Sequence, residues 1–282
     1  MLQALLRYLL RVSSPRRSRL EWWDLVEIGL VALGFLLYFL VRGAVVDRAG
    51  EALTRARSIV TLQSAVGIWV EPRLHAWFLE SDLLTWAMNF VYFWFDFPLI
   101  VGVGLLLFWR RRDCYTLLRD SILISGGLAL VVYWTFPVAP PRFLPEWGFV
   151  DTMAQYSNLS YQAQSMQPFV NPFAAVPSLH VGWAALLAFA IFRATPNTLW
   201  RAAALAVFAL QSVAVVATAN HFVLDAVLGL LICAVGLTMA LVLERRGYPG
   251  VRNAIAWLAR TSPDADQRRP QAVGRGPRAL DR

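Results

Sequence analysis

The fold class is decided by residues 222–243, which read FVLDAVLGLLICAVGLTMALVL and carry one charged residue, Asp225. An α-helix needs about 20 apolar residues to cross a hydrocarbon core. Similar runs occur earlier in the chain, and the expected spans are Leu25–Val46, Leu83–Trp109, Ser121–Val138, Phe173–Phe192, Leu199–Ala219 and Phe222–Leu243. Because lipid cannot pair with exposed backbone groups, these runs predict an all-α, polytopic membrane helix bundle with about six transmembrane helices.

The composition agrees with a membrane protein. Of the 282 residues, 58% are hydrophobic, 16% are charged and 12 are Trp, whereas soluble domains carry about 25% charged residues. The net charge of +8 comes from 26 Arg without a single Lys. No nucleic-acid partner is expected, because these Arg residues do not alternate with aromatic residues in a binding module. The two cysteines, Cys114 and Cys233, indicate neither a disulfide framework nor a metal cluster.

The distribution of Arg predicts the orientation. If both termini are cytoplasmic, the inner segments are the N-terminus, 110–120, 193–201 and 244–282, and they hold 20 Arg against 5 in the outer segments. Cytoplasmic loops carry the excess of basic residues in membrane proteins. We therefore expect a multi-pass protein of the inner (plasma) membrane with both termini cytoplasmic.

Three regions follow from this topology. Residues 1–24 form a cytoplasmic segment with an apolar stripe, expected to lie on the membrane surface. Residues 25–245 form the membrane domain, in which 47–82 is expected to lie along the outer surface as helix. Residues 246–282 form a cytoplasmic tail rich in Arg and Pro, for which no fixed structure is expected.

Four ionisable residues in or directly beside the expected spans stand out: Asp96 in the second, His180 in the fourth, and His221 and Asp225 at the start of the sixth. Such residues are costly in lipid and mark functional sites. All of them except Asp96 reach the outer interface in the expected topology, and Arg142 arrives at the same level. His221 and Asp225 are four residues apart and share one helical face, so the carboxylate can orient the imidazole. A nucleophile oriented by a neighbouring group is the arrangement of covalent catalysis.

The other residues at this level suggest a phosphate site. His180 follows Pro177 and Ser178 at an expected helix start, where backbone N–H groups attract anions. Arg142 offers a charged fork that suits phosphate oxygens, although an Arg at this depth can also simply extend to lipid headgroups. A single intramembrane His is often a packing residue, so the prediction depends on the whole set. For Asp96, a packing role and a catalytic role both remain open.

Two stretches resemble the second and third motifs of the type 2 phosphatidic acid phosphatase superfamily. They read NPFAAVPSLHVGW at 171–183 and TANHFVLD at 218–225. The Pro-Ser-Leu-His form, together with FPVAPPR at 136–142, is similar to the inositol phosphorylceramide synthase (inositolphosphotransferase) branch. The resemblance extends over roughly 80–245 and implies phosphoryl transfer to or from a lipid.

The resemblance also implies catalytic roles. His221 would attack phosphorus and form a phosphohistidine, and Asp225 would orient His221. His180 would protonate the leaving oxygen and then activate the acceptor as a general base. This scheme requires no metal and no cofactor.

The chain departs from the family pattern in its phosphate-binding cations. The usual Lys-x6-Arg-Pro first motif is absent, and Ala214-Val215 stand where a Ser-Arg pair is expected. We expect Arg142 to replace these cations in part, with Ser178 and Asn220 as neutral donors to the substrate.

The expected function is transfer of a phosphorylated headgroup, such as inositol phosphate, between a lipid and an alcohol on the extracytoplasmic side. An alternative is a phosphatase for a lipid phosphate or polyprenyl diphosphate with the same catalytic residues, because nothing in the residues separates alcohol from water. Non-enzymatic alternatives are a haem-binding protein that uses His180 and His221 as axial ligands, and a transporter. An intramembrane metalloprotease is not supported, because the His-Glu-x-x-His motif does not occur.

Overall fold

The computed structural model describes residues 22–43, 48–156, 172–250 and 253. Nearly all of the expected N-terminal surface segment and most of the expected tail lie outside the described residues. The described elements are α2 (Trp22–Gly43), α3 (Ala49–Ala65), α4 (Glu71–Leu79), α5 (Asp82–Trp94), α6 (Phe97–Arg110), α7 (Arg112–Thr135), the 3-10 turns η1 (Pro141–Phe143) and η2 (Pro145–Trp147), α8 (Thr152–Tyr156), α9 (Leu179–Ala194), α10 (Thr198–Ala217), α11 (Val223–Val242) and the π-turn η4 (Leu243–Gly247).

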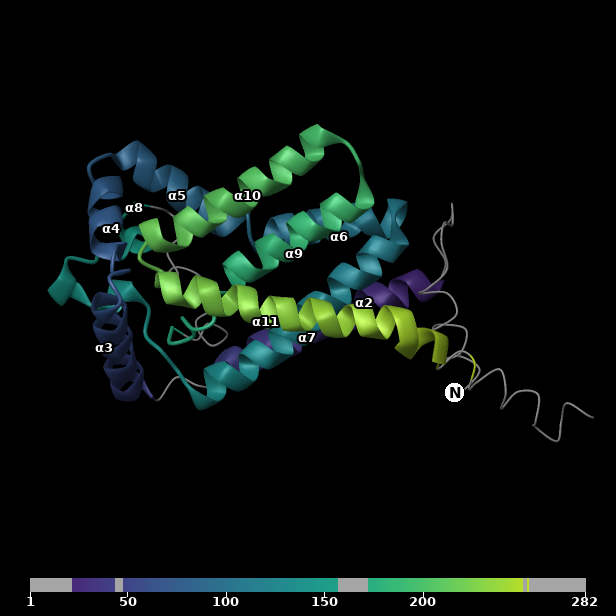
Figure 1. Cartoon of the computed structure of the whole chain (residues 1–282), viewed down its shortest axis with the longest axis horizontal. Helices are drawn as coiled ribbons and strands as arrows, with labels where there is room; N and C mark the ends of the chain where they lie inside the picture. The colour runs from purple at the N-terminus through teal and green to yellow at the C-terminus, as the bar shows by residue number, and fades with distance from the viewer. Residues whose placement is uncertain (1–21, 44–47, 157–171, 251–252, 254–282) are drawn as a thin grey trace, which may run out of the picture.

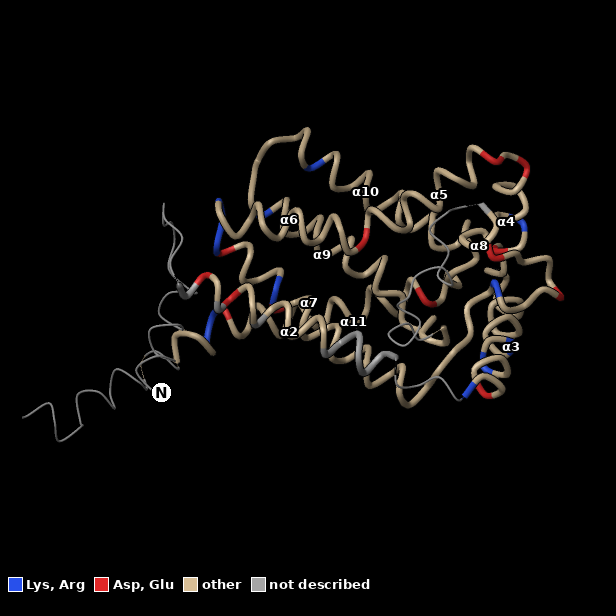
Figure 2. Tube along the Cα trace, turned by 180° about the vertical axis from the view of Figure 1, so that it is seen from behind, with Lys and Arg blue, Asp and Glu red and all other residues tan. Residues whose placement is uncertain are grey.

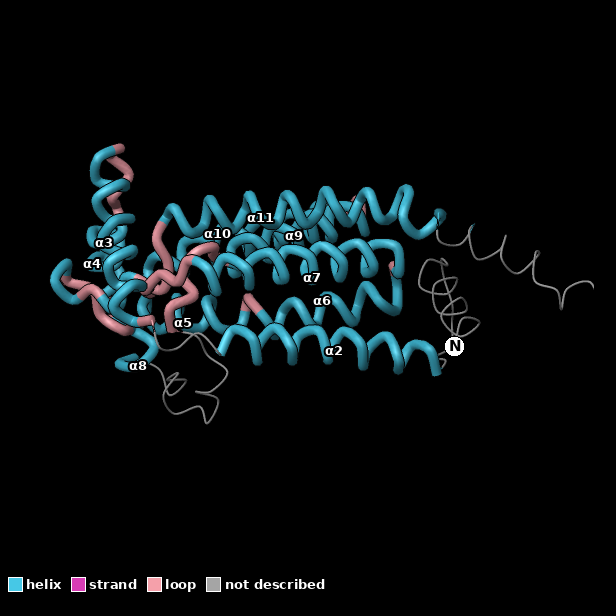
Figure 3. Tube along the Cα trace, turned by 90° about the horizontal axis from the view of Figure 1, so that it is seen from below, coloured by secondary structure: helices cyan, strands magenta, loops and turns pink. Residues whose placement is uncertain are grey.

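The long helices run lengthwise beside one another, and α3, α4 and α8 gather at one end (Figures 1 and 3). Within the described residues, α11 packs mainly against α7 and α9, and α10 packs against α9 and α5. Charged residues gather mostly towards the two ends of the long axis (Figure 2). Large apolar side chains such as Leu199, Leu231 and Trp86 are exposed along the sides. Large exposed apolar surface of this kind suits a lipid environment.

The predicted all-α membrane bundle is confirmed, but the number of spans is not. Among the described residues, three helices are long and apolar enough to cross a membrane: Arg112–Thr135, Thr198–Ala217 and Val223–Gly250. A fourth results if the bent pair of α5 and α6 counts as one span. The fourth expected span is represented by α9, which is apolar but has only 16 residues.

The second expected span is broken in its middle. Helices α5 and α6 meet at an angle of 45°, and α6 has Asp96 at its N-cap and Pro98 in its first turn. Proline has no N–H for the helical hydrogen-bond ladder and is tolerated only at the start of a helix. The apolar run therefore continues in sequence while the helix restarts at Asp96.

The ends of the third and fourth expected spans also differ from the prediction. Helix α7 already begins at Arg112, so most of the expected inner loop 110–120 is helical. Two arginines near the start of α7 form ion pairs with α2. Arg112 lies 2.7 Å from Asp24, and Arg119 pairs with Glu27. Helix α9 begins only at Leu179, because Pro177 disfavours helical backbone in the residue before it. Hydropathy cannot locate either end, since it does not register ion pairs or proline geometry.

Close backbone contact fixes the start of α9 against α11. A Cβ placed on Gly229 of α11 would lie 2.0 Å from the Ser178 carbonyl oxygen, and one on Gly182 of α9 would lie 2.7 Å from the Gly229 carbonyl oxygen. The Ser178 amide also donates to the Asp225 carbonyl (2.9 Å). The segment that carries His180 is thus positioned directly by the helix that follows His221.

Candidate active site

His180 and His221 lie next to each other at the end of the bundle that α3 and α4 cover. Their ring centroids are 5.4 Å apart. His180 occupies the first turn of α9, and His221 lies two residues before α11 begins. Residues that are 41 positions apart in sequence therefore meet because the starts of α9 and α11 pack together.

Two oxygen atoms face Nδ1 of His221. The Ala175 carbonyl lies 2.8 Å from Nδ1 and the Asp225 carboxylate 3.4 Å from it. In the neutral ring, the proton therefore belongs on Nδ1 and the lone pair on Nε2. Asp225 is fully buried, and its Oδ2 also accepts a hydrogen bond from the Phe222 amide (2.8 Å). The predicted proximity of Asp225 is present, and the Ala175 carbonyl is an additional partner that the sequence did not indicate.

A tight turn after α10 places His221. The amides of Asn220 and His221 both donate to the Val215 carbonyl, at 3.1 and 2.9 Å. Ala219 has a φ of 53°, a left-handed conformation that is unfavourable for residues other than glycine. This conformation reverses the chain between α10 and α11, so that His221 points back into the bundle end rather than continuing along α10.

The segment before His180 is held from the other side by the end of α7 and the residues after it. Val138 forms an isolated parallel β-bridge with Ala174. The Tyr133 hydroxyl donates to the Pro177 carbonyl (2.7 Å). These bonds position the Ala175 carbonyl at the ring of His221. The Ser178 hydroxyl is buried and has no hydrogen-bond partner among the residues that the structure describes.

Asp96 is the site residue whose role the sequence left open. Its Oδ2 lies 3.3 Å from Nε2 of His180, and the ring of Tyr92 stacks on the His180 ring with a centroid distance of 4.3 Å. The break between α5 and α6 turns this carboxylate inward. The presence of Pro98 two residues after an intramembrane Asp was the signal that could have identified the break.

Arg142 reaches the site from η1. Its Nη1 donates to Oδ1 of Asn220, its backbone amide donates to the Ala219 carbonyl (2.9 Å), and its Nε lies 3.5 Å from the Asp151 carboxylate. The amide nitrogen of Asn220 instead donates to Thr218 (2.8 Å to Oγ1). Asn220, the residue before His221, thus binds the Arg142 guanidinium, and its role as a direct donor to the substrate stays a prediction.

Two buried side chains from α3 and α4 bind the N-terminus of α11. Glu71 of α4 accepts a hydrogen bond from the Val223 amide (2.8 Å), and Gln63 of α3 accepts one from the Leu224 amide (2.9 Å). The Gln63 amide also donates to Glu71. Both side chains have no exposed surface. A carboxylate at this position is favoured by the unpaired amides and the positive end of the helix dipole.

His75 connects α4 to the last residue of α10, directly before the turn that carries His221. Its Nδ1 lies 2.7 Å from the Ala217 carbonyl, and its Nε2 accepts from the Val150 amide at 3.1 Å. Burial lowers the pKa of His75, in partial opposition to the hydrogen bond with Ala217. A neutral ring fits this geometry, since only a neutral imidazole offers one donor and one acceptor. The segment 47–82, expected to be helical, contains α3 and α4 and the start of α5, and these contacts attach it to the site.

We expect the Gln63→Glu protein to lose about 1.5–3 kcal/mol of unfolding free energy, the typical value of a hydrogen bond to a charged group. The substitution places two carboxyl groups against each other and removes the donor to Glu71. In the double variant Gln63→Glu/Glu71→Gln, donor and acceptor merely exchange places, so stability should return. Thermal unfolding in detergent measures both, and a double variant as unstable as Gln63→Glu would contradict the hydrogen-bond pattern.

Fold and site together define a class: all-α membrane proteins in which two histidines, each beside a carboxylate, meet at one end of the bundle. Residues 57–239 match the family model of the PAP2 superfamily. The match covers more than half of the chain, which therefore belongs to the PAP2 superfamily. Membership points to phosphatase or phosphotransferase chemistry. Comparison with curated proteins and with solved structures gives no match.

Proposed function

We propose that the protein is a membrane phosphotransferase or phosphatase that acts on a lipid phosphate through a phosphohistidine at His221. One observation carries this proposal: the His221 ring presents Nδ1 to two oxygen atoms while the His180 ring lies 5.4 Å away. This arrangement supplies an oriented nucleophile and a second group for proton transfer.

The proposed reaction has two steps. In the first, Nε2 of His221 attacks phosphorus, the bond from phosphorus to the lipid oxygen breaks, and protonated His180 gives its proton to that oxygen. In the second, His180 takes a proton from the acceptor, whose oxygen attacks phosphorus and releases His221. Asp225 and Ala175 stabilise the positive charge that His221 gains in the first step, and the Asp96 carboxylate, 3.3 Å from Nε2 of His180, orients the His180 ring.

The acceptor can be an alcohol or water. We favour an alcohol, and hence an inositolphosphotransferase-like activity, because of the Pro-Ser-Leu-His form at 177–180. Hydrolysis of a lipid phosphate or polyprenyl diphosphate is the second candidate, with the same residues. Membership of the superfamily supports both over a haem-binding protein or a transporter.

Purified protein in vesicles with phosphatidic acid or phosphatidylinositol tests the proposal. Release of inorganic phosphate identifies the phosphatase, and appearance of the phosphorylated headgroup on an added diacylglycerol or ceramide identifies the transferase. The proposal fails if neither lipid is consumed.

We further propose that the site faces outward in the plasma membrane and that both termini are cytoplasmic, as the Arg distribution indicates. In a protein with both native cysteines replaced by serine, a membrane-impermeant thiol reagent applied to intact cells should label Gln155→Cys. The same reagent should not label Arg112→Cys until the membrane is permeabilised. The reverse pattern would place the site in the cytoplasm.

We expect the Arg142→Lys protein to lose activity on the order of 10²-fold, as when a single preorganised oxyanion donor is removed. Arg142 is mostly buried, and Asn220 and the Asp151 carboxylate already orient its guanidinium, so little side-chain freedom is lost when it binds phosphate. The Lys ammonium cannot reproduce the two parallel hydrogen bonds of a planar guanidinium, although Lys reaches lipid headgroups equally well. Steady-state kinetics of Arg142→Lys, with Arg57→Lys on the exposed part of α3 as control, measure the difference. Parental activity of Arg142→Lys would remove Arg142 from the site.

A further inference from the structure

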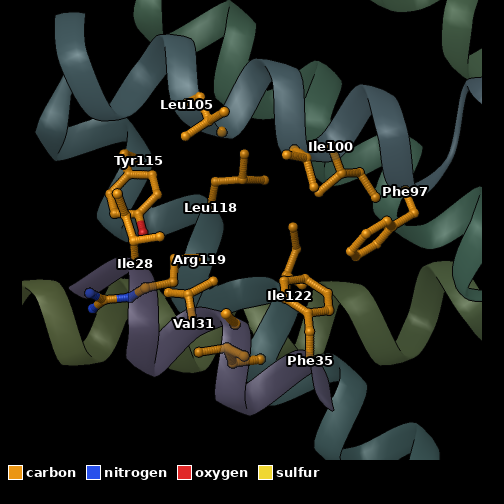
Figure 4. A pocket seen from close by; sticks show the side chains of 14 residues that line it. Ile28, Val31, Phe35, Phe97, Ile100, Leu105, Tyr115, Leu118, Arg119 and Ile122 are labelled. Carbon is orange, nitrogen blue, oxygen red and sulfur yellow. The ribbon is translucent and has the colours of Figure 1, made fainter. Parts of the chain in front are cut away.

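An apolar groove lies between α2, α6 and α7 in the described part of the chain, with a volume of about 360 Å³ (Figure 4). Cavities of this size accommodate small molecules. One face of α6 forms its long wall, through Phe97, Ile100, Val101, Gly104 and Leu105. At 1.5 Å per residue this wall is about 12 Å long, slightly less than half of a hydrocarbon core of about 30 Å.

One end of the groove adjoins the candidate active site. Phe97 follows directly after Asp96, whose carboxylate lies 3.3 Å from His180. Phe35 of α2 closes this end by edge-on packing against Phe97 (5.1 Å between centroids) and Trp183 (6.2 Å). Trp183 lies about one turn after His180 on α9. The groove thus ends at the two elements that hold His180.

The other end of the groove carries polar groups that are engaged with one another. Arg119 forms ion pairs with Glu27 and Asp120, and the Tyr115 hydroxyl donates to Glu27 (3.3 Å). Arg119 and Tyr115 therefore contribute mainly their apolar parts to the lining (Figure 4). An occupant of matching chemistry is a hydrocarbon chain rather than a headgroup.

The groove is accessible from the lipid-facing surface. Ile28, Val101, Leu105 and Leu123 line it, and each keeps more than a third of its surface exposed. A chain could enter sideways from the bilayer. Since lipid tails are as apolar as this lining, occupancy gains little hydrophobic energy. Instead, a bound chain tethers the substrate and thereby keeps its phosphate near the catalytic groups.

We propose that this groove between α2, α6 and α7 binds a hydrocarbon chain of the lipid phosphate substrate and thereby sets the position of its phosphate beside His180. The proposal rests on the proposed function. The substrate would then have a hydrocarbon chain long enough to extend past Phe97 and to reach Val101 and Gly104.

Two glycines of α6 allow a matched test. A Cβ at Gly104 or at Gly102 would meet no heavy atom within 4 Å, but only Gly104 lines the groove. We expect Gly104→Leu to fill the groove and to lower kcat/KM for dioleoyl phosphatidic acid on the order of tenfold, since small misplacement of a reacting group is costly. With dibutyryl phosphatidic acid, whose chains do not reach Gly104, the effect should vanish. Gly102→Leu should resemble the parent with both substrates.

A binding experiment that needs no turnover separates this inference from the catalytic proposal. Phosphatidic acid with a diazirine on one acyl chain is irradiated with His221→Asn protein in vesicles. We expect cross-links on α6 at 100–105, displaced by excess phosphatidic acid but not by a glycosyl diacylglycerol, which has similar chains and no phosphate. Equal displacement by the glycolipid, or cross-links elsewhere, would overturn the proposal even if the enzyme turns over lipid phosphates. Specific groove labelling would support the proposal even if no turnover occurs.

Discussion

The His221→Asn protein should lose turnover of lipid phosphate on the order of 10⁵-fold, because removal of a covalent nucleophile abolishes the catalysed path and leaves only binding effects. Asparagine is the informative replacement, since its amide nitrogen can still donate to the Ala175 carbonyl in place of Nδ1. The side chain then stays oriented while the attacking Nε2 is lost. Initial rates with phosphatidic acid in vesicles measure the effect.

The intermediate itself provides the control for this prediction. Parent protein quenched during turnover of radiolabelled lipid should carry label that survives alkali and is lost in acid, as expected for a phosphohistidine. His221→Asn should carry none, and His75→Gln should keep the label, because His75 binds the backbone groups of Ala217 and Val150. Label retained on His221→Asn would assign the nucleophile to another residue.

The second large effect is expected for the His180→Gln protein. Its turnover of lipid phosphate should fall by about 10²–10⁴-fold, the usual contribution of a general acid or base. The amide nitrogen of glutamine replaces Nε2 of His180 and can keep the contact with Asp96. The loss should depend on the leaving group, because His180 protonates the departing oxygen in the proposed first step.

A pair of substrates tests that dependence. Phosphatidic acid releases a poorly leaving alkoxide and should show the full effect in His180→Gln. A nitrophenyl phosphate ester releases a stable phenolate without protonation, so its phosphorylation of His221, followed as a burst of nitrophenolate, should be far less affected. An equal loss with both substrates would argue that His180 only supports the structure around His221.

Much of the candidate site was predictable from short sequence spacings. The i, i+4 spacing of His221 and Asp225 predicted that their side chains lie close together, although His221 precedes α11 and is held by the turn after α10 rather than by the helix. The Pro-Ser sequence before His180 indicated a helix start. The catalytic roles of these residues stay predictions. The hydrogen bond between Arg142 and Asn220 was indicated by neither a spacing nor a motif.

Helices α3 and α4 show why the rest was not predictable. Gln63 and Glu71 appear as ordinary polar residues in sequence, and nothing local indicates that they bind the amides of Val223 and Leu224. Such contacts join residues more than 150 positions apart. They arise only when α3 and α4 pack across the start of α11. A buried carboxylate is stable there because the helix terminus supplies unpaired amides.

By itself, the sequence determined the class of the protein. Long apolar runs must become helices in lipid because each backbone group needs a partner within its own segment, and this holds without knowledge of packing. Tertiary structure decided where those helices break and end, and which groups face His180 and His221. Asp96 meets His180 only through the bend between α5 and α6, and the Ala175 carbonyl meets His221 only because the start of α9 packs on α11. These contacts depend on relative helix positions, which close packing sets and composition does not encode.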